Sequence, residues 1–154
     1  MKNLILIFVF ITLSFTAFSQ QEYTWDEYGI SFTLADDFQE QVNNGEEFSA
    51  SGDGMELTIL PFKDESVAHA DITSYTLSIA SSMNFERIDD VSVIEFNGFK
   101  GGYAEGVSEG VKLFIMGLMD PDSDTNFFVI IAFTDKDKHA IEEAINICKS
   151  IKRM

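Results

Sequence analysis

Cysteine, proline and basic residues are scarce in this sequence. Its single cysteine, Cys148, excludes an intramolecular disulfide. Its two prolines, Pro61 and Pro121, predict a strand end or edge and a turn, respectively. Lysine and arginine together number 10 against 26 acidic residues, so the formal net charge is −16. A surface this acidic repels phosphate groups, which disfavours nucleic acid and anionic membranes as partners.

The excess of negative charge has two interpretations. The first is solubility outside the cytoplasm, and the second is a cationic partner or a metal ion. Net charge indicates solubility more reliably than it indicates a specific partner. We therefore favour the first interpretation and keep the second open.

Catalytic and metal-binding motifs are also missing. Neither His69 nor His139 stands at metal-ligand spacing from another histidine or cysteine, so both are predicted at the surface. Residues 106–110 (GVSEG) match the letters of the G-x-S-x-G nucleophile motif, but Ser108–Gly110 is predicted as a turn between two strands, whereas this motif needs a turn from a strand into a helix. The sequence has no phosphate-binding glycine loop. Carboxylates remain, but Glu56, Glu105 and Glu109 show no feature that would set them up as an acid–base pair. We predict no cofactor and no catalytic residue.

The first residues have the layout of a secretory signal peptide. Lys2 forms a short positive region, residues 4–15 form an apolar run, and the small residues Ala17 and Ser19 precede a cleavage point before Gln20. The alternative is a membrane anchor, but the apolar run is shorter than the roughly 20 residues that a spanning helix needs. We predict that residues 1–19 are removed and that the protein is secreted or periplasmic.

Residues 20–154 are predicted to form a single globular domain. No later apolar stretch is long enough to cross a membrane, and no cysteine near the cleavage point offers a site for a lipid anchor. The sequence has no internal repeat and no low-complexity tract. A chain of this length buries most of its apolar surface without disulfides.

Alternating segments separated by turn residues predict an antiparallel sheet. The segment Tyr28–Leu34 alternates as a half-buried strand, and Glu47–Phe62 contains two strands around Gly52-Asp53-Gly54. Asn97-Gly98 predicts a type I′ hairpin turn, and Ser108–Gly110 predicts another turn.

Two later segments, Val111–Met119 and Asn126–Phe133, are apolar on both faces, so we expect them at the centre of the sheet. The glycines Gly101 and Gly102 interrupt the strand before them. A bulge or a close backbone approach is expected at these glycines, and a shallow binding groove would be expected near them.

Two helices are predicted to cover the sheet. The first follows Asp71 as its N-cap, and the second runs from about Lys136 to Lys152. The expected buried face of the first helix consists of Ile72, Tyr75, Ile79 and Met83. The second helix would cover one face of the sheet, and the first helix, together with residues 23–28 (YTWDEY), would cover the other. The predicted fold class is α+β, a central antiparallel sheet of about six to seven strands with helices on its faces in an α/β/α sandwich.

Cys148 belongs to the apolar face of the second predicted helix, with Ile141, Ala144, Ile145 and Ile151. This place predicts a small buried hydrophobic residue with an unpaired thiol. The alternative for an odd cysteine in an exported protein is pairing between chains or chemical reactivity.

Asp120, Asp122 and Asp124 alternate in the stretch MDPDSDTNFF, as the first ligands of an EF-hand calcium loop do. The sixth position is Thr125 instead of glycine, and the twelfth is Ile131 instead of glutamate. We therefore predict a solvent-exposed hairpin turn. The three aspartates remain a weak calcium candidate, with an affinity no tighter than about millimolar.

Three stretches resemble the PsbP-like fold family, which also includes the DcrB-type bacterial lipoproteins and a eukaryotic Ran-binding import factor. They are EYGISFTLADDF with Tyr28, Gly29, Phe32 and Phe38, MELTILPFKD, and AIEEAINICKSI with Ala144, Ile147, Ser150 and Ile151. The resemblance covers about residues 25–152, and Ala35 stands where the family often has proline. It implies an accessory or binding protein.

Together these observations predict a secreted or periplasmic, non-enzymatic binding or accessory domain. Its partner would be an unknown protein or small molecule. The alternative function is a secreted hydrolase that uses carboxylates of a surface cleft.

Overall fold

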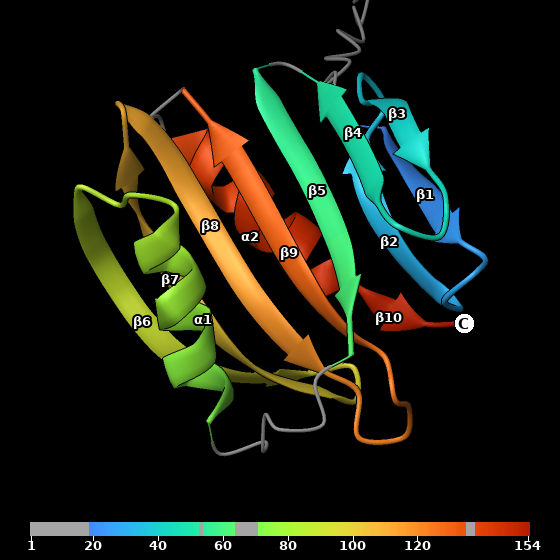
Figure 1. The fold of residues 1–154 in the computed structure, drawn as a ribbon. Coiled ribbons are helices and arrows are strands. Elements are labelled where there is room, and N and C mark those ends of the chain that lie inside the picture. Colours follow the sequence, from blue (N-terminus) through green and yellow to red (C-terminus); the bar gives the residue numbers. More distant parts are fainter. Residues whose placement is uncertain (1–18, 53, 64–70, 135–137) are drawn as a thin grey trace, which may run out of the picture.

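The computed structural model describes residues 19–52, 54–63, 71–134 and 138–154. The predicted signal peptide, apart from Ser19, lies outside the described residues, and so does His69. The elements, in chain order, are β1 (Gln20–Trp25), β2 (Ile30–Ala35), β3 (Gln39–Asn43), β4 (Phe48–Gly52), β5 (Met55–Phe62), α1 (Ile72–Ser82), β6 (Arg87–Phe96), β7 (Phe99–Ser108), β8 (Val111–Met119), β9 (Asn126–Phe133), α2 (Lys138–Ser150) and β10 (Lys152–Arg153) (Figure 1).

The strands form two antiparallel sheets. The large sheet has seven strands in the order β3-β4-β5-β9-β8-β7-β6, and the small sheet has three in the order β1-β2-β10. The predicted fold class, α+β with a central antiparallel sheet, is therefore confirmed. The predicted interior position of β8 and β9, whose two faces are both apolar, is confirmed as well. The small sheet was not predicted.

Two tight turns of the large sheet carry the conformation expected from their sequences. Asn97 and Gly98 have φ values of 49° and 87° between the paired residues Phe96 and Phe99. Glu109 and Gly110 have φ values of 50° and 81° between β7 and β8. Positive φ at both central residues defines the type I′ turn, whose twist matches that of the strands. Both turn predictions are confirmed.

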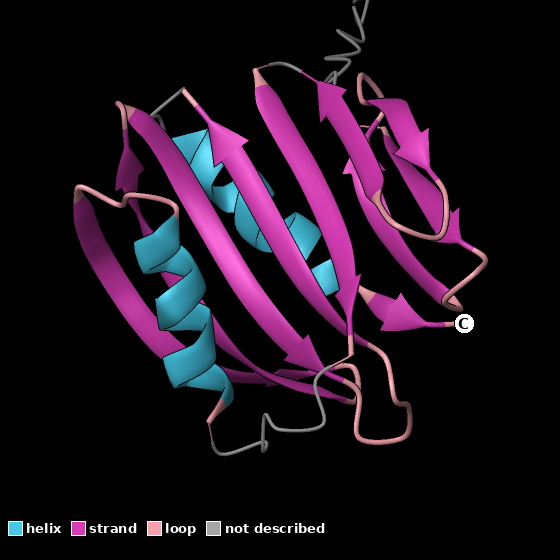
Figure 2. Ribbon diagram, in the orientation of Figure 1, coloured by secondary structure: helices cyan, strands magenta, loops and turns pink. Residues whose placement is uncertain are grey.

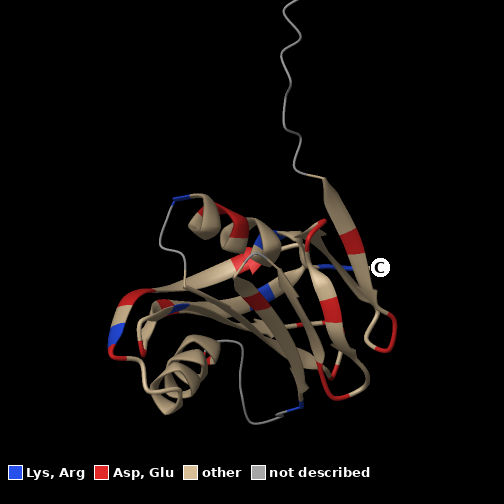
Figure 3. Ribbon diagram, turned by 90° about the horizontal axis from the view of Figure 1, so that it is seen from above, with Lys and Arg blue, Asp and Glu red and all other residues tan. Residues whose placement is uncertain are grey.

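Both faces of the large sheet are covered, one by α1 and the other by α2 and the small sheet (Figures 1 and 2). Seen from above, one helix lies on each side of this sheet (Figure 3). Helix α1 contacts β6, β7 and β8, whereas α2 contacts β9 and the small sheet. The main core fills the space between the large sheet and the layer made by α2 and the small sheet. Its largest fully buried side chains include Trp25, Phe32, Phe48, Phe114 and Phe133.

The expectation that residues 23–28 share a face with α1 is wrong. Trp25 is fully buried on the α2 side, where its ring packs against Phe48 and Phe127. Its indole N–H donates to the carbonyl of Asn44 at 2.8 Å. The reason is the pairing of β1 with β2, because β2 also pairs with β10, which directly follows α2. The N-terminal strands are thereby joined to the α2 layer.

Helix α1 lies unusually close to the sheet, above two glycines. Gly102 and Gly117 are cross-strand partners on β7 and β8. A Cβ at Gly102 would lie 2.7 Å from the Cα of Thr73, and a Cβ at Gly117 would lie 2.6 Å from the Thr76 hydroxyl. The close backbone approach expected at the glycines is therefore present at Gly102. A register shift occurs instead in the pairing of β7 with β6, between Ile88 and Asp90.

This close approach changes the buried face of α1. Its buried residues are Ile72, Thr76 and Ala80, and the predicted Tyr75 and Ile79 are only partly buried. Ile72 packs at the start of the helix, and the smaller Thr76 and Ala80 face the sheet in the following turns, where the helix lies close to the glycines. Asp71 occupies the N-cap position as predicted, but its side chain makes no capping hydrogen bond.

Candidate functional site

A groove opens between α2 and the strands β6 and β7 on the α2 side of the large sheet. Its volume is about 660 Å³. It is lined by Asp90, Ser92, Ile94, Glu95 and Phe96 of β6, Tyr103 and Glu105 of β7, Met116 of β8, and Ile145, Cys148 and Lys149 of α2. The predicted glycines Gly101 and Gly102 are not among the lining residues. The groove nevertheless begins within one residue of them, at Tyr103.

The alternation of β6 explains how the groove acquires an apolar wall. Residues at every second position of a strand share a face. Ile94 and Phe96 therefore point to the groove side, while Val91 packs on the α1 side against the cluster of Ala80, Ala104 and Ile115. Met116 and Ile145 complete the apolar surface from the neighbouring strand and helix.

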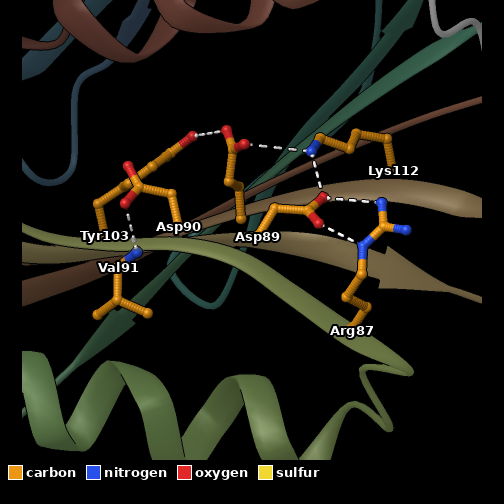
Figure 4. Close-up of polar contacts among 7 residues, drawn as sticks. Arg87, Asp89, Asp90, Val91, Tyr103 and Lys112 are labelled. Atoms are coloured by element: carbon orange, nitrogen blue, oxygen red, sulfur yellow. Dashed lines mark hydrogen bonds and ion pairs between the residues drawn. The ribbon is translucent and has the colours of Figure 1, made fainter.

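At one end of the groove, polar side chains form hydrogen bonds and ion pairs with one another (Figure 4). The Tyr103 hydroxyl donates to one carboxylate oxygen of Glu105 at 2.5 Å. The other oxygen of Glu105 accepts from the Lys112 ammonium at 3.2 Å. Lys112 also reaches Asp89 at 2.9 Å, and Asp89 pairs with Arg87. At this end of the groove, the Tyr103 hydroxyl and the four charged side chains are therefore each paired within one network.

The network sets the protonation of its members. The pKa of Asp89 is lowered to about 2, mainly by the hydrogen bond from Arg87 and to a smaller extent by the hydrogen bond from Lys112. The pKa of Tyr103 is raised above its ordinary value, mainly by burial and to a smaller extent by the hydrogen bond to Glu105. Tyr103 is therefore a neutral phenol at physiological pH, a hydrogen-bond donor and not a base.

The carboxylates considered for hydrolysis are not brought together. Glu105 lines the groove, whereas Glu56 lies on the opposite face of the large sheet, because the next residue along β5, Leu57, is the one that faces the main core. Glu109 lies in the β7–β8 turn. Among the described residues, no group of three His, Cys, Asp or Glu side chains is placed to hold a metal ion. His139 is exposed near the start of α2.

Cys148 forms part of the groove wall from α2. Its side chain is buried, with 6% exposure, and the thiol is free, which confirms the predicted burial. Burial raises the pKa of this thiol to about 12, so it is protonated at neutral pH. Its position in the groove was not predicted.

The aspartate turn differs from the expectation at one residue. Asp122 and Asp124 are exposed, but Asp120 is buried, with 8% exposure. The Arg153 guanidinium lies 2.6 Å from Asp120 and 2.7 Å from Asp122. It also donates to the carbonyl of Gly98 at 3.2 Å. The chain thus supplies its own cation to two of the three aspartates, and the weak calcium affinity stays a prediction.

Arg153 was not identified from the sequence. It follows α2 directly and is distant from the aspartates along the chain. The alternating aspartates indicated a need for positive charge, but the sequence holds no signal that selects Arg153 to supply it.

No helix within the described part of the chain is both long and apolar enough to span a bilayer.

No protein-family model matches the sequence, and no curated protein matches it either. Among solved structures, the Ran-binding protein Mog1p of Saccharomyces cerevisiae is similar to this protein, with a TM-score of 0.64 and 6% identity. The match covers 89% of this chain and 96% of the Mog1p chain. PsbP from the cyanobacterium Synechocystis covers 92% of this chain and 96% of its own, with a TM-score of 0.61 and 9% identity. A protein from Bacteroides thetaiotaomicron covers 82% of this chain but only 45% of its own, with a TM-score of 0.52 and 13% identity. Identities this low establish a fold and not a function. The chain therefore has the PsbP-like fold that the three sequence stretches resemble.

Proposed function

We propose that this protein is a secreted or periplasmic, non-enzymatic binding domain that holds an apolar group of its partner in the groove between α2 and β6–β7. The observation that supports this proposal most directly is the groove itself. Its volume of about 660 Å³ falls within the usual range of ligand sites. An apolar wall beside a few polar groups is the usual composition of such a site.

Binding has more support than catalysis. A general acid or base needs a free proton-transferring group within reach of the substrate. Of the carboxylates that line the groove, Glu105 has both oxygens engaged by Tyr103 and Lys112, and Asp90 and Glu95 are exposed on the edge strand β6. The hydrolase alternative is therefore less well supported than the binding function.

The proposed export rests on the sequence of residues 1–19. The first strand begins at Gln20, so cleavage before this residue would leave β1 intact. Mass spectrometry of the extracellular or periplasmic fraction is expected to find a mature N-terminus within about three residues of Gln20. An intact Met1 in that fraction would contradict the proposal.

The nature of the partner is a separate part of the proposal. One structural neighbour carries the name of a Ran-binding protein, so the fold is compatible with a protein partner. The likeness is one of fold, so it supports a protein partner in general and not Ran in particular.

The groove is tested with the neutral fluorescent dye N-phenyl-1-naphthylamine. We expect the purified protein to enhance the dye's fluorescence and the variant Ile145→Gln to bind it about tenfold more weakly, since an amide replaces an apolar contact. The matched control is Ile88→Gln, because Ile88 lies on β6 outside the groove and is 38% exposed. A dye affinity that Ile145→Gln leaves unchanged, or no binding at all, would contradict the proposed function. Thermal melting checks that both variants are folded.

A further inference from the structure

The two edges of the large sheet differ in how they are protected. Unpaired backbone groups on an edge strand bind other strands unless charge, bulges or a short length prevent it. β3 forms one edge with five residues, exposed polar side chains and a register shift between Glu40 and Val42. β6 forms the other edge with ten residues. Its register shift lies near its start, so the segment from Val91 to Phe96 is regular.

On the side of β6 that faces away from β7, backbone groups of alternate residues in this regular segment point outward. Phe96 and Phe99 flank a two-residue turn, and such flanking residues exchange hydrogen bonds. Hydrogen-bonded and non-bonded positions alternate along an antiparallel pair. The N–H and C=O groups of Val91, Val93 and Glu95 therefore face away from β7. The Val91 N–H already donates to the Asp90 carboxylate at 2.9 Å (Figure 4), so the outward N–H groups that stay available are those of Val93 and Glu95.

Apolar side chains accompany these free backbone groups on both faces of the sheet. Val93 is 76% exposed, an unusual position for a β-branched side chain in a strand. On the other face, Ile94 and Phe96 form the β6 wall of the groove. A strand placed beside β6 would cover Val93 on one face and lie next to the groove on the other.

From these observations we propose that an extended polypeptide segment carrying basic and apolar residues adds to β6 as a further strand. Its main chain would bind the outward N–H and C=O groups of Val93 and Glu95 and the outward C=O of Val91. An apolar side chain on its groove side would reach over Ile94 into the groove. The inference rests on the proposed binding function and specifies the chemistry of the partner.

Charge selects a basic segment over a second copy of this chain. Asp90 and Glu95 are exposed on β6 and line the groove. The whole chain carries a net charge of −16, so two copies repel each other when their β6 strands approach. Lysine or arginine side chains of a partner strand would lie opposite carboxylates instead.

Four synthetic peptides of about eight residues, the length of an ordinary strand, test the proposal with the purified protein. The first alternates lysine and valine, the second alternates glutamate and valine, and the third alternates lysine and serine. The fourth repeats the first with alternate backbone nitrogens methylated, which blocks one edge of the peptide strand. We expect the first to bind at least about tenfold more tightly than each of the others, because each lacks one of the three recognition elements. Its binding is expected to weaken as salt is added.

Variants of β6 locate the binding. Val93→Pro removes an outward N–H and leaves the β7 ladder in place, and proline is tolerated on edge strands. We expect it to reduce affinity for the lysine–valine peptide about tenfold, while Val93→Thr, which keeps the N–H, binds within about threefold of the wild type. In the wild type, the peptide is expected to slow hydrogen exchange of the Val93 and Glu95 amides. This measurement does not depend on the proline variant being folded.

The outcomes separate this inference from the proposed function. Equal binding of the methylated peptide, or unchanged exchange at the Val93 and Glu95 amides, would overturn strand addition. Equal binding of the glutamate–valine peptide would overturn the selection of a basic partner. If the neutral dye binds the groove but no peptide binds, the strand-addition inference fails and the groove proposal stands. If the dye does not bind either, both fail.

Discussion

The guanidinium of Arg153 and the carboxylate of Asp120 form an ion pair of 2.6 Å that joins β10 to the turn between β8 and β9. Arg153 also stacks over the Phe99 ring, with 5.6 Å between the guanidinium carbon and the ring centroid. A residue of the shortest strand thus connects the small sheet to two turns of the large one.

Replacing Arg153 is expected to destabilise the protein. Asp120 is only 8% exposed, so Arg153→Gln leaves a buried carboxylate without its cation. We expect the free energy of unfolding to fall by about 1–3 kcal/mol in urea titrations. The control is Lys152→Gln, whose ion pair with Glu22 is more than half exposed on both sides and is expected to contribute little to stability. Equal effects of the two substitutions would show that burial of Asp120 does not matter.

Calcium binding at the aspartate turn is expected to be weak. Asp120 and Asp122 already neutralise part of their charge with Arg153, and the loop lacks the glycine and glutamate of a high-affinity site. Calorimetric titration of the purified protein is expected to give an affinity no tighter than about millimolar. Micromolar binding that disappears in Asp122→Asn would reveal a true calcium site.

The pair of Asp89 with Arg87 and Lys112 predicts a pH dependence of stability. The pKa of Asp89 falls from 3.8 to about 2 in the folded state, so the folded protein binds this proton less readily than the unfolded chain. The contribution is complete above the unfolded pKa and is lost as the pH falls from about 4 to about 2. Urea unfolding of the wild type and Asp89→Asn should therefore differ above this window and converge at its lower end. A constant difference across the window would contradict the lowered pKa.

The thiol of Cys148 is expected to resist alkylation in the native protein and to react after unfolding. Its burial and its raised pKa both suppress the thiolate, which is the reactive form. Cys148→Ser should lower the free energy of unfolding by about 1–3 kcal/mol, because a hydroxyl replaces the thiol in an apolar site. A disulfide-linked dimer on a non-reducing gel would disagree with this expectation.

An alanine at Gly102 is expected to displace α1. Its Cβ would lie 2.7 Å from the backbone of Thr73, which cannot rotate away as a side chain does. We expect Gly102→Ala to lower the free energy of unfolding by about 1–3 kcal/mol. Gly45→Ala is the control, because its Cβ would meet only the carboxylate end of the flexible Glu27 side chain. If both variants are equally stable, the close approach of α1 is not tight.

The features that were predictable from the sequence are those with local causes. The turn at Asn97-Gly98 follows from the positive φ that these two residue types adopt, and the interior place of β8 and β9 follows from their apolar faces. Thr76 was not predicted to face the sheet, because Gly102 and Gly117 meet only through strand pairing.

The groove was not predictable for a related reason. Its walls come from β6 and α2, and their spacing depends on where α2 packs on the sheet. Ile94 and Ile145 each show an ordinary apolar pattern in sequence, and neither reveals that the two line one groove. The pairing of β10 was also missed, because a strand of two residues, Lys152 and Arg153, carries no periodic pattern.

The position of β10 imposes an order on assembly. β2 lies in the first part of the chain, yet one of its two neighbours is formed by Lys152 and Arg153, and the Met154 amide donates to the carbonyl of Gly29 at 2.9 Å. A chain that emerges from the ribosome or a translocation channel with its N-terminus first can form β1 and β2 early, but it cannot complete this sheet until residues 152–154 are free. The last contacts to form then hold the first strands in place, so the small sheet is complete only after residues 152–154 have joined it.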